Sequence, residues 1–275
     1  KMKPRKSERQ ARILGELRAS PAIRISALAG EFGVSTETIR RDLDELNQQG
    51  MLSRTYGGAA PRPFGAEPTL SERYMEYVEE RERVGALAAR AIKPGQVLMI
   101  DSGSTTVHFA RRLSAELQDL TAITNSCGVA AVLAANPTIR VVLCPGHYDS
   151  REGSVFGSDS ESFLQRFNAN LAVIGCSGLT PQGPNDVSPA AAGIKRAMLA
   201  RAESNMLLLD HSKYDVLALE NVCSLGAIRL IVADRPPAGE LARAIRRAGI
   251  AVEVAGAAEP PAAQPPRRPS GRNGS

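Results

Sequence analysis

The sequence lacks long apolar stretches, paired cysteines and clustered histidines. No apolar run approaches the ~20 residues that a membrane helix requires, and the first residues are polar and basic, unlike an export signal. We therefore expect a cytoplasmic protein without membrane segments. Cys127, Cys144, Cys176 and Cys223 form no C-x-x-C pair, and the three histidines do not cluster with them. This pattern predicts reduced, mostly buried thiols, no metal site and no cofactor.

The largest excess of basic over acidic residues lies near the start of the chain. Residues 1–62 carry twelve Lys and Arg against seven Asp and Glu, whereas residues 63–255 carry nineteen against twenty-one. The basic excess therefore lies in the first segment, as binding to a polyanion requires. The last stretch, 256–275, is rich in Pro, Ala, Gly and Arg without apolar periodicity, which predicts a disordered tail.

Residues 34–50, VSTETIRRDLDELNQQG, predict a DNA-recognition helix. Ser35 occupies the position of an N-cap, where its hydroxyl can accept an orphan backbone N–H, and Gly50 follows the helix as a C′ residue. Apolar residues recur at helical spacing and predict one buried face: Ile39, Leu43 and Leu46. The opposite face then presents short hydroxyls and guanidiniums, groups that reach base edges and phosphates in a major groove.

Two further helices and a wing complete the predicted unit. The first begins near Ser7 and carries Ile13, Leu14 and Leu17; the second carries Ile25, Leu28, Ala29 and Phe32 and ends at Gly33. Together with the third helix they predict a helix-turn-helix. Residues 51–56 predict a strand that Gly57-Gly58 folds back into a two-stranded wing. A small helical subdomain with a solvated basic face is the alternative. The residues expected at the DNA interface are Ser35, Thr36, Thr38, Arg40, Arg41, Arg54, Tyr56 and Gly57.

The rest of the chain alternates short apolar runs with helical patterns. The runs are 97–101, 120–125, 139–146, 171–178, 206–210, 230–234 and 251–255, and helical patterns lie near 79–92, 105–113, 128–134, 159–167, 189–203 and 239–248. This alternation predicts an α/β domain, Rossmann-like, with a mainly parallel sheet covered on both faces. We expect a winged helix-turn-helix domain at 1–60, a proline-rich linker at 61–71, an α/β domain at 72–255 and the tail.

In open α/β sheets ligands bind beyond the carboxyl ends of the strands. After the first run comes DSGSTT, which opens a helix, so backbone N–H groups and hydroxyls predict an anion cradle suited to phosphate. Ordinary N-capping by one hydroxyl is the alternative. Polar residues follow other strands too, although Gly, Ser and Asn are also usual in such loops. The candidate effector residues are Asp101, Ser102, Gly103, Ser104, Thr105, Thr106, Asn125, Ser126, Gly146, His147, Lys195, Asp210 and Lys213.

These motifs resemble those of the DeoR family of bacterial transcriptional regulators. The family's DNA-binding motif is a serine-led TIRRDL helix, then a glycine, an arginine and a Gly-Gly-Ala wing. Its counterparts in this sequence are Ser35, 38–43, Gly50, Arg54 and 57–59. Its D-S-G-S/T-T-T, T-N-S and D-x-S-K-F motifs match 101–106, 124–126 and 210–214, and a family lysine matches Lys195. The resemblance implies a repressor of carbohydrate genes, with an effector domain like ribose-5-phosphate isomerase and CoA transferase. Its expected partners are a double-stranded DNA operator and a phosphorylated sugar.

The chain departs from the family pattern at four places. His147 follows Gly146 in place of a second glycine, Asn170 replaces an aspartate, a glutamate before Lys195 is missing, and a family lysine is replaced by Arg81 or Arg83. An isomerase needs a base matched by an acid, and these changes remove the obvious carboxylates, although Asp101 and Asp210 remain. Two alternatives stay open: an isomerase-like enzyme, or an α/β domain that only oligomerises. A homodimer or homotetramer is expected, because paired recognition helices raise affinity.

Overall fold

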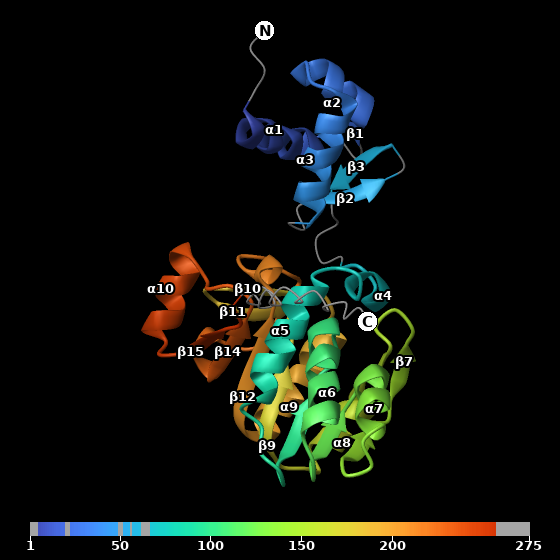
Figure 1. Cartoon of the computed structure of the whole chain (residues 1–275), viewed down its shortest axis with the longest axis vertical. Helices are drawn as coiled ribbons and strands as arrows, with labels where there is room; N and C mark the ends of the chain where they lie inside the picture. The colour runs from blue at the N-terminus through green and yellow to red at the C-terminus, as the bar shows by residue number, and fades with distance from the viewer. Residues whose placement is uncertain (1–4, 20–22, 49–51, 56, 62–66, 257–275) are drawn as a thin grey trace, which may run out of the picture.

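The protein has two parts, each with its own hydrophobic core (Figure 1). Its structure is a computed structural model that describes residues 5–19, 23–48, 52–55, 57–61 and 67–256. Over these ranges no helix is both long and apolar enough to cross a membrane, and no three His, Cys, Asp or Glu side chains gather as a metal site would need. The expected tail lies almost entirely outside the described residues.

The N-terminal part is a helix-turn-helix with a wing. Its elements are α1 (Lys6–Ala19), β1 (Ile23–Arg24), α2 (Ile25–Phe32), α3 (Thr36–Gln48), β2 (Leu52–Thr55) and β3 (Gly58–Pro61). The strands form one antiparallel sheet in the order β1-β3-β2. The three predicted helices and the two-stranded wing are confirmed, whereas the short strand β1 was not expected.

The hydrophobic core of the N-terminal part is formed by apolar residues that recur at helical spacing. Ile39 and Leu43 are fully buried and Leu46 is 1% exposed, so the predicted inner face of α3 is confirmed. They pack with the apolar residues of α1 and α2, including Ile13 and Leu28. Gly33 ends α2 in the left-handed conformation at a φ of 63°, which a glycine adopts at little cost.

The wing depends on two adjacent glycines. Gly57 has a φ of 80° in the turn, and Thr55 pairs with Gly58 across it. A Cβ on Gly58 would lie 2.0 Å from the carbonyl oxygen of Ile23, so β1 could not approach β3 if this residue carried a side chain. The Gly-Gly pair therefore supplies both the turn and the close strand contact.

The C-terminal part is built on a parallel sheet of seven strands. They are β4 (Val97–Ile100), β5 (Thr121–Thr124), β6 (Arg140–Leu143), β9 (Ala169–Ile174), β12 (Ala202–Leu209), β14 (Leu230–Ala233) and β15 (Ala251–Val254). Their order is β15-β14-β12-β9-β4-β5-β6, and every neighbouring pair is parallel. Each strand coincides with one of the seven apolar runs, so the predicted α/β fold is confirmed.

Helices cover both faces of this sheet. On one face lie α5 (Val78–Ala89), α6 (Ser104–Glu116) and α7 (Cys127–Ala134); on the other lie α8 (Ser158–Leu164), α9 (Pro189–Arg201) and α10 (Gly239–Arg247). Alternate residues of one strand serve the two layers, since Leu98 and Ile100 pack with the first group and Met99 with the second. The sheet is therefore buried on both sides, as near-continuous apolar runs require.

The strand order reverses beside the first strand of the sheet. From β4 the chain moves outward through β5 and β6, then returns to β9 on the other side of β4 and continues outward to β15. Loops leaving β4 and β9 consequently diverge and open a crevice at the carboxyl ends of these two strands. Such a switch point is where open α/β sheets bind ligands.

Five short strands decorate this end of the sheet and were not predicted. They are β7 (His147–Asp149), β8 (Ser154–Phe156), β10 (Gly178–Thr180), β11 (Gly183–Asp186) and β13 (Glu220–Asn221), with two single turns, η1 (His211–Lys213) and η2 (Leu225–Ala227). They are two to four residues long and mostly polar, so they carry no apolar period. They frame the crevice at the switch point.

The segment just before α5 packs onto the α/β part. The short helix α4 (Leu70–Arg73) begins with a capping box between Thr69 and Glu72. The backbone N–H of Leu70 donates to the carbonyl oxygen of Arg151 at 2.9 Å, and its side chain is 7% exposed. Residues 67–71, which composition places in the linker, are thus held against this domain.

Candidate functional site

The recognition helix presents its polar face to solvent. Ser35 caps it, because its Oγ accepts the N–H of Thr38 at 3.1 Å, and this predicted cap is confirmed. Thr36 is exposed, Thr38 is half-buried, and the side chains of Arg40 and Arg41 are 57% and 77% exposed. Both guanidiniums lie 3.5–3.7 Å from the Glu37 carboxylate, an exposed contact that a DNA phosphate could replace at little cost.

A buried ion pair fixes the recognition helix on α1. The Nη2 of Arg9 donates to Asp42 Oδ1 at 3.0 Å, and a second, shorter contact joins Arg9 Nε to Oδ2. Both side chains are at most 9% exposed. Since Asp42 lies beside the apolar face, the bidentate contact sets the rotation of α3 and so determines which residues point outward.

The wing residues expected at the interface are placed less fully. Arg54 belongs to β2 and Gly57 to the turn that follows, so both lie on the predicted wing. Tyr56 and Gly50 lie outside the described residues. The wing contribution to DNA contacts therefore stays a prediction.

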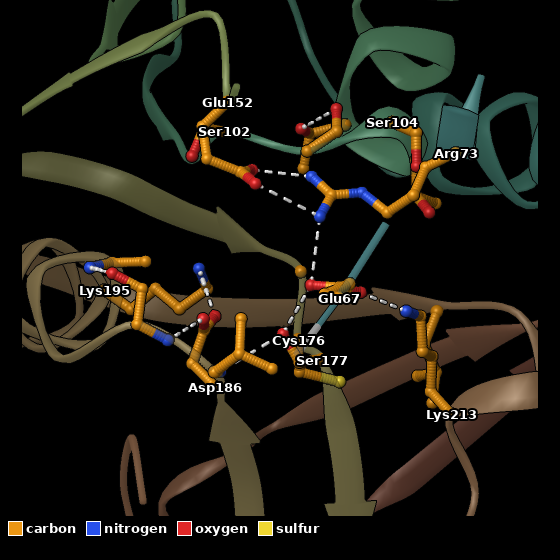
Figure 2. Close-up of a pocket in the computed structure, with 18 of the residues that line it drawn as sticks. Glu67, Arg73, Ser102, Ser104, Glu152, Cys176, Ser177, Asp186, Lys195 and Lys213 are labelled. Carbon is orange, nitrogen blue, oxygen red and sulfur yellow. Dashed lines mark hydrogen bonds and ion pairs between the residues drawn. The ribbon is translucent and has the colours of Figure 1, made fainter. Parts of the chain in front are cut away.

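The α/β part contains a pocket of about 600 Å³, including space open to solvent, at the switch point between β4 and β9 (Figure 2). Its wall combines the loop after β4, the loop after β9, the start of α9 and residues 67–73. The lining residues are Glu67, Arg73, Ser102, Gly103, Ser104, Thr105, Thr106, Glu152, Gly175, Cys176, Ser177, Asp186, Val187, Ser188, Ala191, Lys195, Leu208, Leu209 and Lys213. Charged side chains from distant parts of the sequence therefore line the same pocket.

Helix α6 opens onto the pocket without a capping side chain. Its N-cap is Gly103, at a φ of 148°, and the hydroxyl of Thr106 donates to the Gly103 carbonyl oxygen instead of accepting an N–H. The first N–H groups of a helix have no intrahelical partner and carry partial positive charge. By contrast, Ser126 caps α7 and Ser188 caps α9. Ordinary N-capping does not account for the hydroxyl-rich start of α6, which leaves it suited to an anion.

Lys195 forms the floor of the pocket. Its Nζ lies 2.9 Å from one carboxylate oxygen each of Asp101 and Asp186, and its side chain is 3% exposed. Burial disfavours the ammonium, but the two carboxylates outweigh burial and hold the pKa of Lys195 above its ordinary value. Asp101 also accepts the N–H of Gly175 at 3.3 Å, which ties the end of β4 to the end of β9.

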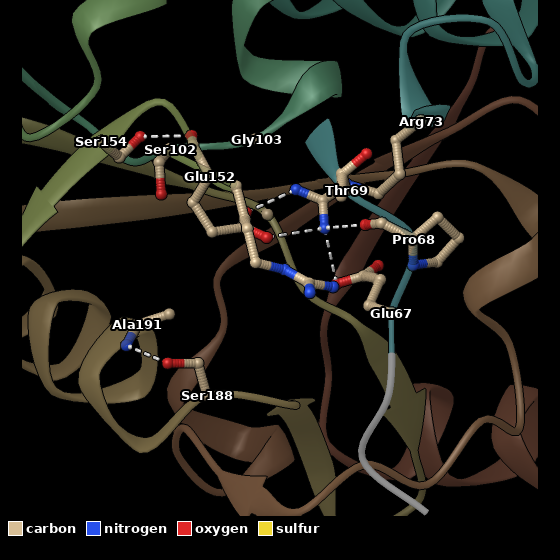
Figure 3. A network of polar contacts seen from close by, with 12 residues as sticks. Glu67, Pro68, Thr69, Arg73, Ser102, Gly103, Glu152, Ser154, Ser188 and Ala191 are labelled. Atoms are coloured by element: carbon tan, nitrogen blue, oxygen red, sulfur yellow. Dashed lines mark hydrogen bonds and ion pairs between the residues drawn. The ribbon is translucent and has the colours of Figure 1, made fainter. Parts of the chain in front are cut away.

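Arg73 forms the opposite wall (Figure 3). Its Nη2 donates to Glu152 at 2.6 Å, and its Nη1 donates to the carbonyl oxygen of Pro68 at 3.2 Å. Burial disfavours the guanidinium, but Glu67 and Glu152 outweigh burial and raise the pKa of Arg73. Because Glu152 lies in the turn between β7 and β8, this hairpin also helps to position Arg73.

The carboxylate of Glu67 lies in the pocket between two cations. It lies 2.5 Å from Lys213 Nζ and 3.0 Å from Arg73 Nη1, and it accepts the hydroxyl of Ser177 at 2.7 Å. Burial opposes ionisation, but Lys213 and Arg73 outweigh it and lower the pKa of Glu67 to about 2. The carboxylate is therefore charged at neutral pH.

The structure brings together part of the predicted effector set. Ser102, Gly103, Ser104, Thr105, Thr106, Lys195 and Lys213 line the pocket, and Asp101 supports it from below through Lys195. Asp210 lies beneath Lys213 instead, where it pairs with Arg81 at 2.9 Å. Burial would raise the pKa of Asp210, but Arg81 and Lys213 outweigh it, so the pKa is lowered. Arg81, rather than Arg83, thus lies beside the strand-end aspartate.

Four predicted residues lie away from the pocket lining. Asn125 donates to the carbonyl oxygen of Val155, and Ser126 caps α7. A Cβ on Gly146 would lie 2.3 Å from Ser160 Oγ, so this glycine serves close packing, and His147 is exposed at the start of β7. Asn170 accepts the N–H of Val97 at the amino ends of β9 and β4, opposite the end that carries the pocket. Each of these contacts is structural in the free protein.

Several pocket residues were not predicted: Glu67, Arg73, Glu152, Asp186 and Ser188. They lie in short or irregular segments, and their partners are distant in sequence, so periodicity offers no signal for them.

The cysteines contribute no reactive group to the pocket. All four are free; Cys144 is buried, and Cys127, Cys176 and Cys223 are half-buried. Cys176 lines the pocket, and burial raises the pKa of its thiol to about 12. A neutral thiol is a poor nucleophile and contributes mainly surface.

Known proteins resemble the chain along most of its length. Residues 9–61 match the model of the DeoR-like helix-turn-helix domain, and residues 76–235 match that of the DeoR C terminal sensor domain. The glycerol-3-phosphate regulon repressor of Escherichia coli is 30% identical over 85% of this chain and 92% of its own length. The HTH-type transcriptional repressor GlcR of Bacillus subtilis is 30% identical over 90% of this chain and 95% of its own.

Solved structures resemble the chain more distantly. Ribose 5-phosphate isomerase A of Methanocaldococcus jannaschii matches 50% of this chain and 55% of its own, at 17% identity and a TM-score of 0.38. The eIF2B delta subunit of Chaetomium thermophilum matches 82% of this chain and 70% of its own, at 13% identity and a TM-score of 0.46. Likenesses of this order carry no conclusion about function.

Proposed function

This chain belongs to the DeoR family of transcriptional regulators, and we propose that its pocket binds a phosphorylated sugar that weakens the binding of the helix-turn-helix to an operator. The helix-turn-helix binds DNA, and the C-terminal domain is an effector sensor. The relatives that are 30% identical to this chain over most of its length include transcriptional repressors and not enzymes, and this chain is likewise a repressor. What remains to be proposed is the effector and how it acts.

The uncapped start of α6 is the observation that carries this proposal. Its free N–H groups face the same pocket as Lys213 and Arg73. A phosphate binds well where helix N–H groups meet cationic side chains, because charge-assisted hydrogen bonds are about twice as strong as neutral ones. This end of the pocket therefore has the chemistry of a phosphate subsite.

The remaining wall suits a polyhydroxylated body. Asp186, Glu152, Ser177 and Ser102 offer carboxylate and hydroxyl oxygens toward the pocket, and each can pair with a ligand hydroxyl. The name of the Escherichia coli relative, a glycerol-3-phosphate regulon repressor, fits a small phosphorylated polyol or sugar.

Two finer points belong to the same proposal. We expect a homodimer or homotetramer, because one recognition helix offers few contacts and paired helices reach half-sites ~34 Å apart or a multiple of that. A regulator of this kind acts on the chromosome, so its expected location is the cytoplasm. An α/β domain that only oligomerises is the competing proposal, and ligand binding distinguishes the two.

Calorimetry with a panel of sugar and polyol phosphates, each beside its unphosphorylated parent, tests this proposal. We expect the wild type to bind at least one phosphate, and Lys213→Ala to weaken that binding by about tenfold or more, because a hydrogen bond to a charged group contributes about 1.5–3 kcal/mol. Lys93→Ala is the matched control, since Lys93 is exposed and remote from the lining. Absence of binding, or equal losses for phosphate and parent, would contradict the proposal, and turnover of any ligand would reopen the enzyme alternative.

A further inference from the structure

The strongest anion-binding donors of the pocket are engaged by a carboxylate of the chain itself. Glu67 contacts Lys213, Arg73 and Ser177, which come from three separate parts of the sequence (Figure 2). An ammonium, a guanidinium and a hydroxyl within 3.0 Å of one carboxylate are also the donors that a phosphate would use. Glu67 therefore lies where part of an anionic ligand would lie.

We infer that Glu67 is an internal competitor for the effector phosphate and a specificity-determining residue of this pocket, an inference that rests on the proposed function. Loss of a carboxylate partner destabilises a cation in a site this desolvated. A neutral sugar cannot replace that carboxylate beside Lys213, which is 17% exposed, or beside Arg73, which keeps Glu152. A phosphate can. The pocket thus selects phosphorylated over neutral sugars by charge, whichever hydroxyl groups the sugar carries.

Glu67 and a bound phosphate cannot share these donors. The Glu67 side chain is 13% exposed and is charged at neutral pH, since its pKa lies at about 2. A phosphate at Lys213 and Arg73 would leave this carboxylate desolvated, without its partners and beside a second negative charge. Entry of the phosphate therefore expels Glu67 from the pocket.

Expulsion reaches the DNA-binding domain through the chain. Pro61 ends β3 of the wing, and Glu67 follows six positions later, so the two lie at most about 20 Å apart. After Glu67 the chain is held independently, because Thr69 caps α4 and Leu70 is buried against the domain. Release thus detaches residue 67 from the pocket while α4 stays in place.

Inorganic phosphate, titrated by calorimetry at constant ionic strength, tests the competition. We expect Glu67→Gln to bind phosphate about tenfold or more tightly than the wild type, because a competitor that fills the site in nine of ten molecules weakens apparent affinity tenfold. Glu79→Gln, which removes the same charge from an exposed position on α5, should bind as the wild type does. The comparison separates local competition from a change in net charge.

Each other outcome is decisive. Equal or weaker binding by Glu67→Gln overturns the inference while leaving the proposed function intact, since the phosphate site would still exist. Failure of phosphate and of every sugar phosphate to bind either protein overturns both.

A fluorescence measurement tests the expulsion itself. The chain contains no tryptophan, so Ala66→Trp introduces a single probe beside Glu67. Saturating phosphate should lower the anisotropy of this probe, because its neighbour is no longer anchored, and in the Ala66→Trp/Glu67→Gln protein the anisotropy should be low before phosphate is added. An anisotropy that stays constant on saturation would contradict the expulsion of Glu67.

Discussion

Replacing Lys195 with methionine removes the central charge of a buried triad. The ammonium lies 2.9 Å from both Asp101 and Asp186, and none of the three side chains is more than 8% exposed. Methionine keeps the length and apolar stem of lysine but leaves two carboxylates in a desolvated site without their cation. The change therefore isolates the contribution of charge.

The expected loss is large. Removing one partner of a buried ion pair typically costs about 3–5 kcal/mol, which is a substantial part of the roughly 5–15 kcal/mol that stabilises a typical domain. Urea unfolding of the wild type and of Lys195→Met measures the difference. Lys93→Met is the matched control, and as an exposed substitution it should stay within about 0.5 kcal/mol of the wild type.

The pH dependence gives the sign of the effect. The pKa of Lys195 is raised in the folded protein, so its stabilising contribution is fully present below the unfolded lysine pKa of about 10.4 and is lost only as pH rises through the folded value. Without the ammonium, burial and the charge of Asp186 raise the pKa of Asp101 further, and the hydrogen bond from Gly175 opposes them. A carboxyl whose pKa is raised by folding destabilises progressively as pH rises above its unfolded value of about 3.9. The deficit of Lys195→Met should therefore be larger near pH 8 than near pH 5.

Two results would refute this reasoning. A loss below about 0.5 kcal/mol would mean that Lys195 does not neutralise buried carboxylates in the free protein. A large loss that is the same at both pH values would attribute the effect to packing rather than to charge.

Other predictions concern DNA binding and its coupling to the effector. Arg40→Ala/Arg41→Ala should weaken operator binding in gel-shift titrations with little change in thermal stability. The slope of log affinity against log salt concentration should flatten by about one unit per lost phosphate contact. Arg90→Ala is the control, and an unchanged affinity of the double variant would remove α3 from the interface. Gly58→Ala should weaken DNA binding in the same titrations, because its Cβ would lie 2.0 Å from the Ile23 carbonyl oxygen and displace the wing; an unchanged affinity would contradict this. Gly-Ser residues inserted near Gly65 should preserve both binding activities yet reduce the effect of ligand on DNA affinity; a full response would place the coupling elsewhere.

The frame of the fold could be predicted from the sequence because its strands and helices are periodic. The seven apolar runs correspond to the seven strands of the main sheet, and the cap at Ser35 and the wing glycines follow from local backbone chemistry. The hairpin at 147–156 and the strands around 178–186 are short and polar, so local patterns do not reveal them. Their positions depend on contacts with the completed sheet.

The pocket was only half predictable for the same reason. The start of α6 is a continuous motif, whereas Glu67 is 146 residues from Lys213, and Arg73 is 79 residues from Glu152. Composition assigns Glu67 to a linker, and no local signal links it to the pocket. Asn125 and Ser126 also follow a strand. In the free protein Asn125 bonds to β8 and Ser126 caps α7, so their role in effector binding stays a prediction.

The most direct test of the regulatory account is the operator dissociation constant with and without a saturating sugar phosphate, measured by fluorescence anisotropy on DNA selected from a random library. In the wild type the effector should weaken operator binding by at least about tenfold, which corresponds to ~1.4 kcal/mol of coupling. At the same ligand concentration, Lys213→Ala should bind operator equally well with or without the effector. An unchanged wild-type constant, or the same weakening in Lys213→Ala, would contradict the account.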